Sequence, residues 1–144
     1  MSLRRSALAA AAALALVGAA GCTADSVLDL TVGDCLNQSD LEGDEISTVK
    51  ALDCETEEHD AEVYAEHVFT EDSYPGEDAV HEKAVDVCTE EFETFMGVSY
   101  AESALYVVPL SPSQDSWEDA DDRTALCIVL YDEPQTGSLA GAQI

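Results

Sequence analysis

The chain has 144 residues, enough for one folded domain, and its charge is strongly unbalanced. It carries 31 Asp and Glu but only 5 Lys and Arg, which gives a formal net charge of −26 at pH 7. Binding to DNA or RNA needs clustered basic residues, so this composition excludes nucleic acid as a partner.

The first 22 residues have the features of a lipoprotein export signal. Arg4 and Arg5 precede an unbroken run of Ala, Leu, Val and Gly over residues 7–20, shorter than the roughly 20 residues of a membrane span. Small residues then lead into Cys22, whose thiol would take a lipid with acyl chains such as palmitate. We therefore expect a signal peptide at residues 1–21 and a lipidated Cys22 that holds the protein on the outer face of the cytoplasmic membrane. The alternatives are an ordinary secretory signal with a free Cys22 thiol and a retained transmembrane helix.

The remaining chain is expected to form a short spacer, residues 22–31, and one extracytoplasmic domain, residues 32–141. Four strands are expected, at residues 47–52, 61–69, 103–110 and 124–131. In the second strand the side-chain pattern alternates from one residue to the next, which predicts that one face is shared by Val63, Ala65, His67 and Phe69. The fourth is continuously apolar, which predicts a central strand buried on both faces.

Between these strands the sequence predicts one main helix and one short helix. Pro75-Gly76 and Gly97 mark the two ends of the main helix. Its apolar residues recur at helical spacing, interrupted by Glu91, and include Cys88. The short helix spans residues 113–119, with Ser113 as its N-cap. The fold class is therefore α+β, a mainly antiparallel sheet with the main helix packed on one face.

Five cysteines are present, and lipidation of Cys22 leaves an even number. Cys35, Cys54, Cys88 and Cys127 would form two disulfides outside the cytoplasm, with three possible pairings. We favour Cys35–Cys54, which closes the shorter loop, and Cys88–Cys127, which ties the main helix to the central strand. No CxxC or CxH spacing is present, so we expect no zinc site, no other metal site and no cofactor.

The sequence shows no catalytic constellation, and no catalytic residue is predicted. A G-x-S-x-G nucleophile motif is missing. His59-Asp60 is interpreted as a turn pair at the start of a strand, and Trp117 as an anchor in the core. Arg123, which follows Asp122, is expected to form a structural ion pair with a neighbouring acid.

Several short motifs together resemble the septum formation domain family of actinobacterial envelope proteins. In chain order they are Val32-Gly33-Asp34-Cys35-Leu36, Asp53-Cys54, His59-Asp60-Ala61-Glu62-Val63-Tyr64, Tyr74-Pro75-Gly76, Cys88, Phe92, Trp117, Asp122-Arg123, Cys127 and Thr136-Gly137-Ser138-Leu139. The resemblance implies a membrane-tethered extracytoplasmic domain with two disulfides and a link to cell division. It brings no catalytic residues with it.

Three classes of function are compatible with these features. The first is a non-enzymatic interaction module, anchored by lipid, that binds an envelope or division protein during septum formation or cell-wall growth. The second is a carrier of cations or small ligands that uses the acidic surface. The third is a small hydrolase acting on wall material.

Overall fold

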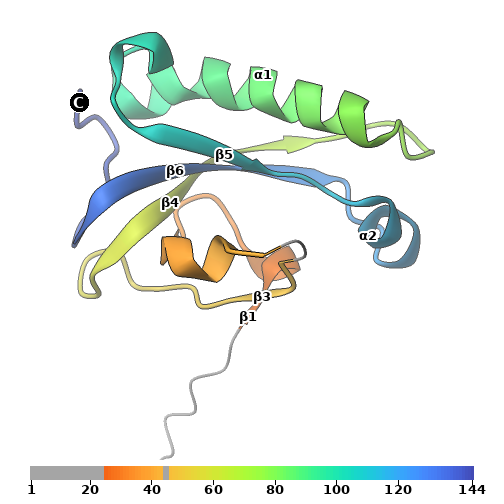
Figure 1. Ribbon diagram of the computed structural model, residues 1–144, viewed down its shortest axis with the longest axis horizontal. Helices are drawn as coiled ribbons and strands as arrows, with labels where there is room; N and C mark the ends of the chain where they lie inside the picture. Colours follow the sequence, from red (N-terminus) through yellow and green to blue (C-terminus); the bar gives the residue numbers. More distant parts are fainter. Residues whose placement is uncertain (1–24, 44–45) are drawn as a thin grey trace, which may run out of the picture.

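The computed structural model describes residues 25–43 and 46–144, so the expected signal peptide and Cys22 lie outside the described residues. Its centre is an antiparallel four-stranded sheet in the order β2-β4-β6-β5. The strands are β2 (Cys35–Leu36), β4 (His59–Val68), β6 (Thr124–Gln135) and β5 (Tyr106–Leu110). Helix α1 (Glu77–Met96) crosses one face of the sheet, and the N-terminal segment covers part of the other (Figure 1). The three layers confirm the α+β class.

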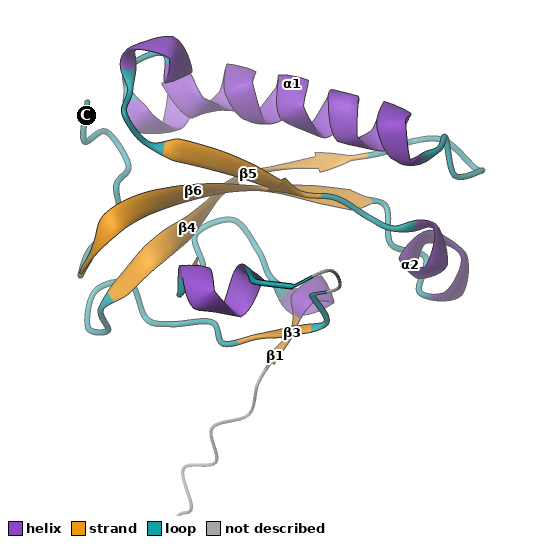
Figure 2. Ribbon diagram, viewed as in Figure 1, coloured by secondary structure: helices purple, strands orange, loops and turns teal. Residues whose placement is uncertain are grey.

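The N-terminal layer is made of short elements. β1 (Asp25–Ser26) pairs antiparallel with β3 (Thr48–Val49), and the 3₁₀ turns η1 (Val27–Asp29) and η2 (Gln38–Leu41) complete the layer (Figure 2). Leu30 lies in this layer, is only 6% exposed and packs in one cluster with Val63 and Ile128 of the main sheet. Residues 25–31 therefore belong to the fold, whereas the sequence assigned them to a spacer, because apolar side chains such as Leu30 are buried against the sheet.

Strand β6 is the central strand that its apolar run predicted. Residues 125–129 are all buried, and β6 pairs with β4 on one side and β5 on the other. Cys127 and Val129 belong to the cluster under α1, whereas Leu126 and Ile128 belong to the cluster under the N-terminal layer. Because both faces are covered over residues 125–129, this part of the strand is continuously apolar rather than alternating.

Helix α1 has the expected start, end and buried stripe. It begins after Gly76 (φ 102°) and ends at Gly97 (φ 84°), whose N–H donates to the Glu93 carbonyl. A positive φ at both ends suits glycine, which has no Cβ to clash. The side chains that it buries lie one turn apart and are Val80, Ala84, Cys88, Phe92 and Met96. The turn η3 (Tyr100–Glu102) then leads into β5.

Strand β4 departs from simple alternation. Its register against β6 shifts between Val63 and Ala65, which is the signature of a β-bulge. Val63 packs in the cluster under the N-terminal layer, while Ala65 packs against the cluster under α1. The prediction that both residues share a face was therefore wrong, because the extra residue at the bulge, Tyr64, reverses the alternation.

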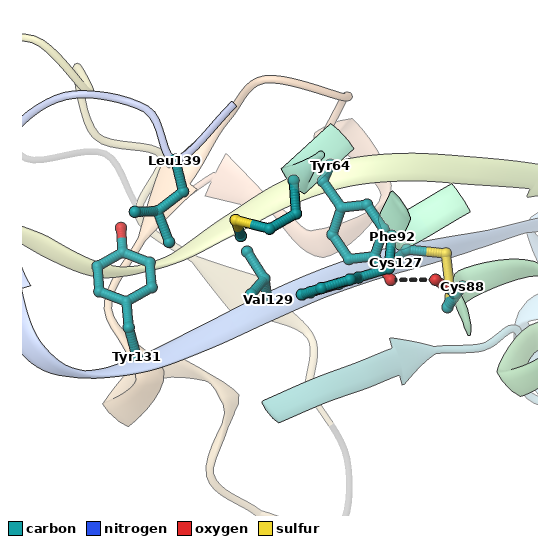
Figure 3. Packing of buried hydrophobic residues seen from close by; sticks show 8 residues of the cluster. Tyr64, Cys88, Phe92, Cys127, Val129, Tyr131 and Leu139 are labelled. Atoms are coloured by element: carbon teal, nitrogen blue, oxygen red, sulfur yellow. Dashed lines mark hydrogen bonds between the residues drawn. A yellow bond between two sulfur atoms is a disulfide. The ribbon is translucent and has the colours of Figure 1, made fainter. Parts of the chain in front are cut away.

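The core between α1 and the sheet is cross-linked and aromatic (Figure 3). Cys88 is bonded to Cys127, and the Tyr64 hydroxyl donates to the Cys88 carbonyl oxygen at 2.5 Å. The Tyr64 and Phe92 rings meet edge to face, with centroids 5.9 Å apart. The helix is thus held on the sheet around Cys88 and Phe92 by a disulfide, a hydrogen bond and aromatic packing.

The second disulfide joins Cys35 to Cys54, so the structure has the two pairings that the sequence favoured. The Cα atoms are 5.4 Å apart in Cys35–Cys54 and 5.2 Å apart in Cys88–Cys127. Both values lie within the usual range for disulfides. Cys35–Cys54 fastens the turn before β4 to β2, at the edge of the main sheet.

Candidate functional site

Several of the sequence motifs converge at one end of the sheet, although they are far apart in the chain. The Val63 N–H donates to the Asp34 carbonyl oxygen at 2.9 Å, which joins the segment before β2 to β4. The Gly137 N–H donates to the Cys54 carbonyl oxygen at 2.5 Å, which joins the C-terminal segment to the disulfide turn. We call the polar group at this end the motif cluster, which consists of Cys35, Cys54, His59, Glu62, Tyr131 and Ser138.

Glu62 is the buried acid of the motif cluster, only 2% exposed. One carboxylate oxygen accepts from the Ser138 hydroxyl at 2.5 Å and the other from the Leu139 N–H at 2.9 Å. Burial of Tyr131 raises the pKa of its phenol well above the usual value, and the carboxylates of Glu62 and Asp60 raise it further. Glu62 is therefore a structural tie that holds the C-terminal segment on β4.

His59 is the first residue of β4 and is fully buried, whereas the sequence placed it in a turn. Its Nδ1 lies 2.9 Å from the Glu57 carbonyl oxygen, while its Nε2 has no hydrogen-bond partner among the described residues. The ring meets that of Tyr131 edge-on, with centroids 5.9 Å apart. Asp60 faces the N-terminal layer, where its carboxylate accepts from the Gln38 N–H at 2.5 Å.

A second motif group lies at the junction of α2 (Gln114–Asp119) and β6. Ser113 caps α2 in a capping box with Ser116, and Trp117 is buried. The Arg123 guanidinium lies 4.1 Å from the centre of the Trp117 ring and donates to the Trp117 carbonyl oxygen at 2.8 Å. It also pairs with the Asp121 carboxylate at 3.0 Å. Cation–π contact and hydrogen bonding thus hold the turn between α2 and β6.

Asp122 is also engaged in this turn. Its carboxylate accepts from the Ser116 hydroxyl at 3.0 Å and from the Thr124 N–H at 3.1 Å. These contacts account for the Asp122-Arg123 motif as a turn-forming unit. The structure does not bring this group together with the motif cluster, which lies at the opposite end of β6, near Gln135.

An apolar face of β5 remains uncovered. Tyr106 is 64% exposed and Val108 is 36% exposed, and Leu110 follows on the same side of the strand. We call these three residues the β5 face. It lies on the same side of the sheet as the N-terminal layer, because Leu110 packs against the cluster of that layer.

The outer edge of β5 has no strand partner within the described residues, since β5 ends the sheet order. Pro109 lies within β5, and proline fits a strand only where its nitrogen points away from the partner strand. The open edge therefore lacks one N–H donor, which protects it against pairing with another strand. The exposed apolar part of β5 is therefore its β5 face rather than its backbone edge.

The β5 face leads into a groove of about 550 Å³ between the N-terminal layer and α2. Leu28, Leu110 and Leu126 are among its apolar lining residues, and Glu66 and Asp122 are its acidic ones. A second hollow, of about 810 Å³, lies between the start of α1 and the loop before α2. Neither is lined by His59, Asp60 or Trp117.

The comparisons with known proteins identify the family. A model of the septum formation family matches residues 32–143, nearly the whole described domain, so the chain belongs to this family. No curated protein and no solved structure matches the chain. Within residues 25–43 and 46–144, no helix combines the length and hydrophobicity needed to cross a bilayer.

Most of these residues stand in the sequence motifs, but the roles of Glu62 and Ser138 and the exposure of Tyr106 were not predicted. Glu62 and Ser138 were present in matched motifs, yet nothing in the sequence indicates that residues 76 positions apart bond to each other. Tyr106 was hidden within an apolar run. Its exposure follows from the edge position of β5, which pattern alone does not reveal.

Proposed function

We propose that this protein is a lipid-anchored, extracytoplasmic and non-enzymatic interaction module that acts in septum formation. Membership of the septum formation family supports the process. The Arg4-Arg5 start, the apolar run and Cys22 support export and anchoring on the outer face of the cytoplasmic membrane.

The observation that carries the interaction role is the exposed β5 face. A tyrosine that is 64% exposed beside an exposed valine offers an apolar contact surface, and tyrosine is enriched among residues that dominate binding energy. The motif side chains, by contrast, are engaged within the fold, as the contacts of Glu62, Asp122 and Arg123 show. The β5 face is therefore the surface that we assign to a partner.

Charge indicates the chemistry of that partner. The chain has a net charge of −26, and Glu66 and Asp122 line the groove beside the β5 face. A second acidic copy would be repelled, whereas a protein with basic residues around an apolar side chain would be attracted and oriented. We therefore assign the surface to an envelope or division protein with a basic, amphipathic segment.

Complementation in a depletion strain tests this function. Val108→Lys in the β5 face should leave export and folding intact but abolish correct septum placement, because the added positive charge repels the basic residues of the partner and removes the apolar contact. Val85→Lys is the matched control, since Val85 is 39% exposed on α1, away from the β5 face. Equal septum placement with both variants at equal protein levels would refute the assignment.

Anchoring has its own test. Cys22→Ser should release the protein from the membrane fraction and remove labelling by an alkyne fatty acid. Retention in the membrane without lipid label would instead support a retained transmembrane segment and refute the lipid anchor.

A further inference from the structure

The sulfur atoms of Cys35 and Cys54 and a ring nitrogen of His59 all lie within 4.8 Å of one another. Within the described residues, this is the only place where three Cys, His, Asp or Glu ligand atoms gather so closely. In the oxidised protein the two sulfurs are bonded to each other. We propose that reduction of this disulfide creates a binding site for a thiophilic divalent cation such as Zn²⁺.

His59 has the properties of a preorganised ligand. It is fully buried, and in the oxidised protein no group within residues 25–43 and 46–144 forms a hydrogen bond with its Nε2. Its Nδ1 lies 2.9 Å from the Glu57 carbonyl oxygen, which fixes Nδ1 as the protonated nitrogen and leaves the lone pair of Nε2 free. Histidines that bind metals are commonly oriented by a hydrogen bond of this kind from the other ring nitrogen.

The backbone around both cysteines is held by contacts that do not depend on the disulfide. The Leu52 N–H donates to the Cys35 carbonyl oxygen at 2.7 Å, and Cys35 also pairs with Glu62 between β2 and β4. The Cys54 carbonyl oxygen accepts from the Gly137 N–H. After reduction the two thiols therefore remain near His59, where side-chain rotation can separate the sulfurs to the roughly 3.8 Å that a tetrahedral zinc ion with Zn–S bonds of about 2.3 Å requires.

The chemistry balances without further groups. A dithiol reductant supplies two electrons and two protons, so the Cys35–Cys54 bond breaks to two thiols while the reductant becomes a disulfide. Zn²⁺ then replaces the two thiol protons, which pass to solvent. Two thiolates and a dication give no net charge, which suits a site formed by the buried residues Cys35 and His59. Water can reach the fourth coordination position of the metal because Cys54 is half-buried.

The two disulfides differ in their exposure to solvent. Cys88 and Cys127 are both fully buried between α1 and β6, whereas Cys54 is partly open to solvent. A dithiol therefore reaches Cys35–Cys54 first. The disulfide and the metal site are alternative states of the same two sulfurs, so metal binding reports the redox state of this end of the sheet.

Co²⁺ binding tests the proposal, because thiolate ligation gives a charge-transfer band that carboxylate ligation on the acidic surface does not. The full-length chain carrying Cys22→Ser, so that no other thiol exists outside the disulfides, is reduced until alkylation shows only Cys35 and Cys54 free. We expect one Co²⁺ per chain with this band in the reduced protein and none in the oxidised protein. A reduced protein without the band would overturn the proposal.

Two variants and one direct measurement identify the ligands. His59→Asn keeps a donor near the Glu57 carbonyl but removes Nε2, and should weaken Co²⁺ affinity more than about tenfold. His81→Gln, at an exposed position on α1, should leave it unchanged. Equal affinity in His59→Asn would overturn the assignment. X-ray absorption of the reduced chain loaded with Zn²⁺ gives the ligand shell without a variant, and a shell lacking two sulfurs or an imidazole nitrogen would also overturn it.

Discussion

Glu62 is expected to govern the stability of the C-terminal segment. Glu62→Ala removes the acceptors of the Ser138 hydroxyl and of the buried Leu139 N–H. Hydrogen bonds to a charged group contribute about 1.5–3 kcal/mol each, the exposed serine at the low end and the buried amide at the high end. The free energy of unfolding should therefore fall by about 4 kcal/mol, equivalent to a drop in Tm of roughly 15 °C for a domain of this size.

The loss should spread to α1, because the segment held by Glu62 also covers the end of that helix. The Gly141 N–H donates to the Phe95 carbonyl oxygen at 2.8 Å, and the Gln143 N–H donates to the Met96 carbonyl oxygen at 3.0 Å. Amide hydrogen exchange at Gly141 and Gln143 should accelerate in Glu62→Ala more than exchange in the middle of α1.

Two controls make this prediction specific to the contact. Glu62→Gln keeps the side-chain volume and one acceptor, so its cost should be less than half that of Glu62→Ala. Glu66→Ala removes an exposed acid from the same strand and should change the free energy of unfolding by less than about 0.5 kcal/mol. A denaturation series in which Glu62→Ala and Glu66→Ala behave alike would refute the reasoning.

Three further predictions concern the helix-to-sheet core, and a fourth concerns the turn between α2 and β6. Replacing Cys88 and Cys127 by Ser opens a loop with a sequence separation of 39 and should cost about 4 kcal/mol in denaturant unfolding. Phe92→Ala leaves a cavity in the core and should cost about 3–5 kcal/mol, whereas an unchanged midpoint would contradict its packing. Burial raises the pKa of the Tyr64 phenol. The stability that depends on the protonated phenol is therefore complete below the pKa of the unfolded state, near 10, and falls as pH rises further. The stability gap between wild type and Tyr64→Phe should therefore narrow above about pH 10, and a constant gap would count against this. Arg123→Ala should cost about 1–2 kcal/mol and alter Trp fluorescence, and no spectral change would argue against the cation–π contact.

The elements with strong local signals could be predicted from sequence. α1 carries its own glycine boundaries and a buried residue at each turn, and β6 carries a continuous apolar run. Ser113 caps α2 with its side chain, and a serine in this position can be recognised in the sequence as a helix N-cap. Each of these features depends on residues only a few positions apart.

Features that depend on distant segments could not be predicted. The bulge at Tyr64 is set by pairing between β4 and β6, so the alternation read from the sequence failed at Val63. The two-residue strands β1 and β2 are too short to give a periodic pattern. His59 was placed in a turn because its burial comes from neighbours such as Tyr131, which lies in another strand.

With the proposed lipid anchor, the position of β1 would limit the height of the domain above the membrane. If Cys22 carries the proposed lipid, Asp25 begins β1 only three residues later, and three extended residues reach about 10 Å. That distance is close to one Debye length at physiological salt, so the headgroups and this acidic domain affect each other directly. The β5 face lies on the side of the sheet that carries this N-terminal layer. A partner would then meet the protein beside the lipid surface, as the juxtamembrane segment of a neighbouring membrane protein does.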